Sequence, residues 1–170
     1  QLESWEIKVT ESFDECIADC DAIMLEINDP AYHLEYFKKV TQLGKPIFLD
    51  KPLADTYASG KAICDLAKKN NVRVFSSSSL RFVTAIVEAK KAISEPEFVN
   101  VYGALGTAFA GSSVVWYGVH TMEMLQRLMG SGAVSLKATQ DEKGVVCFVK
   151  YKNGSRGIVE LNSGSYIYGG

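Results

Sequence analysis

The stretch Pro46-Ile47-Phe48-Leu49-Asp50-Lys51-Pro52 decides how the rest of the chain is interpreted. A short apolar run bounded by turn residues is typical of a buried strand, so we expect a strand at 46–49. Lys51 then follows the carboxyl end of that strand, the edge where ligands bind in open α/β sheets. The stretch alone allows two interpretations of Lys51: a group poised for chemistry, or a solvated charge at a strand end.

The residues on either side of this strand predict a parallel sheet. Apolar runs indicate strands, and apolar residues at helical spacing between cap residues indicate helices. In chain order we expect a strand at 5–9, a helix capped by Ser12, a strand at 22–27, a helix from Asp29 to Gly44, the strand at 46–49, a helix from Asp55 to Asn71, and a strand at 72–75. Alternating strands and helices with short connections are typical of parallel strands joined by right-handed crossovers.

The pattern changes near residue 80. We then expect a helix at 83–93, a strand at 97–105, a Gly/Ala/Ser-rich loop at 106–117, a helix at 119–129, and strands at 133–139, 144–151 and 155–161. Asn153-Gly154 between the last two strands is a strong hairpin signal and indicates antiparallel pairing. The predicted fold class is therefore α/β followed by α+β.

Composition excludes several classes of function. Eighteen basic and twenty acidic residues give a net charge of −2, which offers no footprint for nucleic acid or an anionic membrane. No apolar run approaches the ~20 residues that span a bilayer. We expect four free thiols, Cys16, Cys20, Cys64 and Cys147, which suit a reducing cytoplasm. With only two histidines in the chain, we expect no metal site.

Several short motifs occur in an informative order. They are Asn28-Asp29-Pro30 with His33, Gly44-Lys45 before Asp50-Lys51-Pro52, Arg81-Phe82, Gly118-Val119-His120-Thr121-Met122-Glu123 before Gly130, and Asn153-Gly154. In this order, over about residues 5–164, the chain resembles the Gfo/Idh/MocA family of glucose–fructose oxidoreductase and inositol dehydrogenase. The resemblance implies a partial Rossmann parallel sheet and a second domain with a mainly antiparallel open sheet. The implied domains are 1–80, the C-terminal part of a nucleotide-binding domain, and 81–170, an α+β domain for substrate and oligomerisation.

The resemblance also implies a reaction: hydride transfer between NAD or NADP and a secondary alcohol of a sugar or polyol. His120 would be the general base, because an imidazole titrates near neutral pH, and Lys51 would stabilise charge on the alcohol oxygen. Implied cofactor contacts are Asn28, His33, Asp50, Lys51 and Arg81, and implied substrate contacts are Trp116, Tyr117, His120 and Glu123. The residues themselves leave alternatives open. His33 and Trp116 are also compatible with packing, His120 with a structural role, and Glu123 with orienting His120 or with a surface position.

Three departures from the family pattern qualify this interpretation. No glycine-rich Gly-x-Gly-x-x-Gly turn follows a predicted strand. The near match Gly130-Ser131-Gly132-Ala133-Val134-Ser135 follows a helix and precedes a strand, the reverse of the context that binds a pyrophosphate. Trp116 occupies the position where active members usually carry an aspartate, and Asp50 replaces the usual glutamate.

These departures support a second hypothesis, a non-catalytic binding or assembly module. In either case we expect a homodimer or homotetramer formed through the 133–161 sheet. A hydrolase is not favoured, because there is no Gly-x-Ser-x-Gly elbow and the serines at 76–79 have no histidine nearby in sequence.

The absent glycine-rich part also has a structural consequence. Without the strands that precede it in a Rossmann sheet, the 22–27 strand would have an open edge. We expect that edge to be covered by the 5–9 strand or by another chain, and the chain to be either an excised fragment or a shortened family member.

Overall fold

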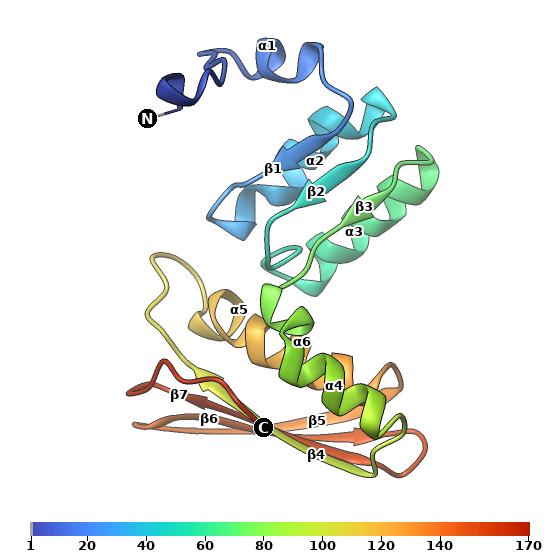
Figure 1. Ribbon diagram of the computed structural model, residues 1–170, viewed down its shortest axis with the longest axis vertical. Coiled ribbons are helices and arrows are strands. Elements are labelled where there is room, and N and C mark those ends of the chain that lie inside the picture. The colour runs from blue at the N-terminus through green and yellow to red at the C-terminus, as the bar shows by residue number, and fades with distance from the viewer. Residues whose placement is uncertain (1) are drawn as a thin grey trace. The chain divides into compact units, whose positions relative to one another are not determined.

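The computed structural model describes residues 2–170, which form two units (Figure 1). The first unit ends at Ser76 and the second begins at Ser77. Each unit has an apolar core of its own, built from a sheet and the helices that cover one of its faces.

The first unit contains a three-stranded parallel sheet in the order β1-β2-β3. The strands are β1 (Ile23–Leu25), β2 (Ile47–Leu49) and β3 (Val74–Phe75). Ile23 pairs with Ile47, which in turn pairs with Val74, so β2 is the central strand. The parallel sheet predicted from the alternating strands and helices is confirmed.

The helices of the first unit are α1 (Phe13–Ala18), α2 (His33–Val40) and α3 (Tyr57–Lys69), with 3-10 turns at Glu3–Trp5, Pro30–Tyr32 and Thr41–Leu43. Ser12 caps α1 by accepting a hydrogen bond from the Glu15 amide, and Thr56 caps α3 in the same way through Ser59. Phe37, Val40 and Ile63 of α2 and α3 are fully buried in the core that they form with β2.

The strand predicted at 5–9 does not form. Glu3–Trp5 is a 3-10 turn, Glu6 adopts a left-handed conformation at φ 58°, and Ile7 and Val9 are 47% and 54% exposed. Alternating apolar residues favour a strand only where one face can be buried, and here neither is. Within residues 2–170, β1 therefore pairs with β2 along one edge and with no strand along the other. Coverage of that edge by another chain stays a prediction.

The second unit contains a four-stranded sheet in the order β4-β7-β6-β5. The strands are β4 (Phe98–Ala104), β5 (Ala133–Asp141), β6 (Gly144–Tyr151) and β7 (Arg156–Asn162). β4 runs parallel to β7, and the other two pairs are antiparallel, so the mainly antiparallel sheet is confirmed. The predicted hairpin joins β6 and β7, with Gly154 at φ +88° and Asn153 Oδ1 accepting from the Ser155 amide.

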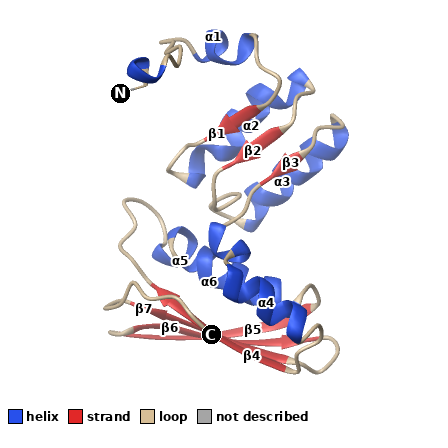
Figure 2. Cartoon of the chain, viewed as in Figure 1, coloured by secondary structure: helices blue, strands red, loops and turns tan. Residues whose placement is uncertain are grey.

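The helices of this unit are α4 (Thr84–Ala92), α5 (Ser113–Trp116) and α6 (Gly118–Met129), preceded by a 3-10 turn at Ser79–Phe82. They lie over one face of the sheet (Figure 2). Met124, Leu125 and Leu128 of α6 are buried in the core beside strand residues such as Val159. The predicted 106–117 loop is wrong in one part: 113–116 is helical, because Val114 packs against this core.

Candidate active-site residues

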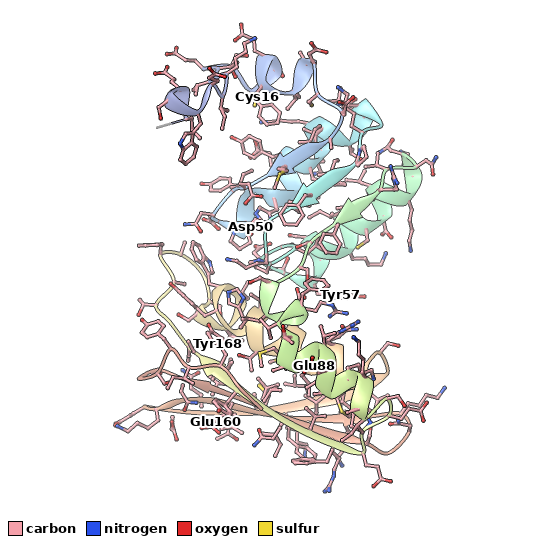
Figure 3. The ribbon with its side chains drawn as sticks, viewed as in Figure 1. Cys16, Asp50, Tyr57, Glu88, Glu160 and Tyr168 are labelled. Carbon is pink, nitrogen blue, oxygen red and sulfur yellow. The ribbon has the colours of Figure 1, made fainter. Side chains whose placement is uncertain are left out.

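The carboxyl ends of the parallel strands meet at one edge of the first unit's sheet. β1 leads to Asn28, β2 into Asp50 and Lys51, and β3 into Ser76. The Asp50 amide donates to the Leu25 carbonyl at 3.0 Å, and Ser76 Oγ lies 3.5 Å from the Asp50 carbonyl. The backbone at Asp50, labelled in Figure 3, is thus held by both neighbouring strands. Edges of this kind bind ligands in α/β proteins.

Lys51 occupies the position at this edge that the sequence predicts. Its Nζ lies 3.8 Å from Asp50 Oδ2, and the two side chains are 30% and 25% exposed. A partly exposed ion pair at this distance contributes about 1 kcal/mol or less, so it leaves the ammonium available to another partner. The Lys51–Pro52 peptide bond is cis.

His33 lies inside the first unit, with no exposed surface. Its Nε2 is 2.7 Å from the Ile27 carbonyl oxygen and its Nδ1 is 3.2 Å from the Leu53 carbonyl oxygen. The ring thereby joins the segment after β1 to the segment after Lys51. Since both nitrogens face backbone carbonyls, the geometry favours the packing role over direct contact with a cofactor. Asn28, by contrast, is exposed.

His120 lies on α6 in the second unit and is half-buried. Its Nδ1 is 2.6 Å from the hydroxyl oxygen of Ser78. Its ring also meets the ring of Tyr168 edge-on, with 6.0 Å between the centroids. Tyr168, labelled in Figure 3, comes from the segment that follows β7. The imidazole is therefore contacted by two segments far apart in sequence.

Glu123 lies one turn after His120 on α6. One carboxylate oxygen accepts from Ser77 Oγ at 2.8 Å, and the other accepts from the Ser78 amide at 3.1 Å. Arg81 is 3.9 Å from the same carboxylate and also donates to Gln126 Oε1. Glu123 and Arg81 thus belong to one polar network inside the second unit. Their predicted contacts with substrate and cofactor stay predictions.

Trp116 and Tyr117 lie where α5 gives way to α6, and both are half-buried. The Trp116 ring contacts the ring of Phe109 edge-on, at 5.9 Å between centroids. The Tyr117 ring packs over Gly106, where a Cβ atom would come within 2.6 Å of it. These contacts fix two aromatic side chains beside the start of α6, and their role toward substrate stays a prediction.

Ser78 is the residue of this region that sequence reasoning missed. Ser78 lies 42 positions before His120, so the sequence carries no sign that the two side chains meet. The available signal was a polar run directly after a predicted strand. A serine hydrolase remains unsupported: its nucleophile contacts Nε2 while a carboxylate orients Nδ1, whereas fully buried Ser78 contacts Nδ1.

The cofactor contacts predicted at Asn28 and Lys51, both at the carboxyl edge of the sheet, would form only part of a dinucleotide site. The sequence holds no strand followed by a glycine-rich turn and a helix N-terminus to receive a pyrophosphate. Within residues 2–170, no cluster of three His, Cys, Asp or Glu side chains has metal-binding geometry. The helices in this part of the chain are all too short or too polar to cross a membrane.

The chain is similar in sequence to known oxidoreductases. Residues 1–78 match the model of an oxidoreductase family with an NAD-binding Rossmann fold, GFO_IDH_MocA. The oxidoreductase YhhX of Escherichia coli is 30% identical over 138 residues, which are 73% of this chain and 40% of that protein. Levoglucosan dehydrogenase of Pseudarthrobacter phenanthrenivorans is 28% identical over 131 residues, 76% of this chain and 34% of that protein.

The fold is shared with solved structures over nearly the whole chain. An NAD-binding protein from Listeria innocua superposes with a TM-score of 0.78 at 24% identity, covering 98% of this chain and 56% of that one. This likeness establishes the fold. The chain spans 40% or less of the length of the two curated relatives named above.

Proposed function

We propose that this chain, whose residues 1–78 match the Gfo/Idh/MocA oxidoreductase family, forms part of an NAD(P)-dependent oxidoreductase acting on a sugar, polyol or related secondary alcohol. The observation that carries the proposal is Lys51, two residues after a buried parallel strand within the segment that matches the NAD-binding family. The similarity to levoglucosan dehydrogenase supports the substrate class. Because the chain spans only part of its relatives, the activity is proposed for the protein that contains it.

In the proposed reaction the nicotinamide cofactor, when bound, exchanges a hydride with the alcohol carbon. The Lys51 ammonium stabilises negative charge on the alcohol oxygen, and the His120 ring accepts the hydroxyl proton. The weak Asp50 contact leaves Lys51 able to reorient toward a substrate oxygen. Reduction of the corresponding ketone would use the same groups in the reverse direction.

The remaining residues are proposed to bind rather than to react. Asn28, Asp50 and Arg81 would contact the cofactor. Trp116 and Tyr117 would present aromatic faces to the C–H surface of a sugar. Glu123 would act on the substrate side through the serine turn to which it is bonded.

Fluorescence titration with NADH and with NADPH tests the proposal and separates the two cofactors. For the protein that contains this chain, saturable binding, followed by oxidation of levoglucosan, glucose or myo-inositol, is the expected result. Lys51→Met should lower kcat by about 100-fold or more while retaining cofactor binding, because it removes charge stabilisation from the reacting oxygen.

The matched control is Lys45→Met, at the opposite end of the same strand, which should leave kcat unchanged. A kcat for Lys51→Met equal to that of the protein without the substitution would contradict the role proposed for Lys51. Absence of any saturable nicotinamide binding by the protein that contains this chain would contradict the proposal.

Two observations favour the second candidate, a binding or assembly module. The Trp116 side chain has no acidic group, and every residue of β5 is exposed, including the large apolar side chains of Val134 and Leu136.

In both candidates, the 133–161 sheet is proposed to form a homodimer or homotetramer. Sedimentation equilibrium of the chain and of Leu136→Lys tests this: the variant should be monomeric. A dimer that binds neither NADH nor NADPH would favour the module.

The proposed location is the cytoplasm. The four cysteines are all free thiols, and Cys147 is buried in the core of the second unit. Unpaired cysteines are typical of reducing compartments.

A further inference from the structure

The ring of Tyr168 packs against the imidazole of His120. The two centroids are 6.0 Å apart and the ring planes meet at 81°, an edge-to-face geometry within the separation of about 4.5–7 Å that aromatic pairs favour. Tyr168 belongs to the segment after β7, and His120 lies on α6 of the same unit. The contact therefore joins the segment after β7 to the helix that carries the proposed base.

Two features of β4 hold the Tyr168 ring in place. The next residue, Gly169, exchanges both backbone hydrogen bonds with Tyr102 of β4, at 2.8 and 3.0 Å. The ring itself lies against Gly103 of the same strand, where a Cβ atom would come within 2.5 Å of it. The glycine thus leaves the space that the ring occupies, and one strand fixes both the backbone and the side chain.

The imidazole of His120 needs contacts of this kind to adopt one orientation. The torsion that turns a histidine ring about its Cβ–Cγ bond has only a broad preference, so neighbouring groups determine the plane of the ring. Ser78 contacts the ring at one atom, with 2.6 Å between its hydroxyl oxygen and Nδ1. A contact at a single atom leaves the tilt of a plane open, whereas packing against a second ring restricts it.

We propose that Tyr168 is a positioning residue, whose ring sets the plane of the His120 imidazole for proton exchange with substrate. This inference rests on the proposed function, in which His120 is the general base. Orientation matters to such a base, because misplacement of a reacting group by about 1 Å can cost about 100-fold in rate. Burial raises the pKa of Tyr168, and Tyr117 and Tyr166 raise it further, so the phenol keeps its proton at neutral pH, as a packing role requires.

NMR of the histidine rings tests the proposal. The chain has two histidines, so the His33 signals serve as an internal reference for the His120 signals. In the unchanged chain we expect nuclear Overhauser effects between the His120 ring protons and both Tyr168 and Ser78. Tyr168→Leu should weaken those between His120 and Ser78, because the ring is then free to tilt, and should leave the His33 signals unchanged. Tyr168→Phe, which keeps the ring, should restore them.

The matched control is Tyr166→Leu, which removes an exposed tyrosine from the same segment and should leave the His120 signals unchanged. Gly103→Ala supplies a second route, since it displaces the Tyr168 ring without removing it. It should also weaken the effects between His120 and Ser78, which tests the proposal even if Tyr168→Leu does not fold.

Kinetics of the same variants, in the protein that contains this chain, supply the second measurement. Tyr168→Leu should lower kcat by about 10-fold with KM changed by less than about two-fold, because the orientation of the base affects proton transfer and not substrate binding. Tyr168→Phe should recover most of the lost kcat, since positioning needs the ring and not its hydroxyl.

The outcomes separate this inference from the proposed function. Unchanged effects between His120 and Ser78 in folded Tyr168→Leu, or in Gly103→Ala, would overturn the positioning role whatever the activity. Failure of Tyr168→Phe to restore them would also overturn it, because the hydroxyl and not the ring would then be the group that acts. If Tyr168→Phe restores them but the protein binds no nicotinamide cofactor, the proposed function fails while the orientation of the ring by Tyr168 stands.

Discussion

The regions around His33 and His120 use the same side chain in opposite ways. His33 is fully buried in the first unit, and both of its nitrogens face backbone carbonyl oxygens at 2.7 and 3.2 Å. His120, in the second unit, is half-buried, and its Nδ1 faces the hydroxyl of Ser78 at 2.6 Å. The difference lies in the partners, because a carbonyl oxygen only accepts whereas a hydroxyl both donates and accepts.

This difference is compatible with the roles proposed for the two residues, a structural one for His33 and proton exchange for His120. A ring set between two backbone acceptors joins two chain segments, and a neutral ring donates to one of them at a time. A hydroxyl can pair with a ring nitrogen as donor or as acceptor, so the contact of His120 Nδ1 with Ser78 is compatible with either state of that nitrogen. The first arrangement supports the segment that carries Lys51, and the second suits a general base.

The largest expected difference between the two regions is in the free energy of unfolding that is lost when each histidine is replaced. His33→Ala should lower the free energy of unfolding by about 3 kcal/mol, because it leaves a cavity and at least one buried carbonyl group without its hydrogen-bond donor. His120→Ala should lower it by about 1 kcal/mol or less, since the site is half-buried. Urea denaturation followed by circular dichroism measures both. Equal losses would mean that the distinction between the two regions is wrong.

Gly103→Ala should have an intermediate effect, confined to the His120 region. A Cβ at this position in β4 would collide with Thr121 Oγ1 and would come within 2.5 Å of the Tyr168 ring. We expect a loss of about 2 kcal/mol from overpacking, together with a change in the His120 signals as Tyr168 is displaced. Gly164→Ala, with open space around it, is the control and should be neutral. A change in the His33 signals instead would contradict the local effect.

The smallest expected effect concerns two tyrosines of the second unit. Burial raises the pKa of Tyr151, and burial together with Tyr117 and Tyr166 raises the pKa of Tyr168. The folded state therefore favours the neutral phenols. Their contribution to stability is complete below the ordinary tyrosine pKa of about 10 and is lost as pH rises through the folded values.

Phenolate absorbance as a function of pH checks this prediction, and Tyr168→Phe and Tyr151→Phe should each remove one late-titrating group. Titration of all eight tyrosines in a single step near the ordinary pKa would contradict it.

Much of the fold follows from local patterns that need no knowledge of distant residues. The 46–49 run between turn residues becomes β2, Ser12 and Thr56 cap helices, and Asn153-Gly154 forms a hairpin. The predictions fail where burial of apolar side chains determines the secondary structure. Ile7 and Val9 alternate as in a strand, but both are exposed and no strand forms. Val114 packs against the core of the second unit, and 113–116 is helical.

The sequence by itself determined most of the order of elements, the family resemblance and the position of Lys51 at a strand end, because each depends on residues close together in the chain. Only the tertiary structure decided that His33 joins two backbone segments and that Ser78 and Glu123 hold the region of His120. Hydrogen bonds between residues more than forty positions apart leave no local pattern. They arise when packing of the apolar faces brings the polar groups within reach.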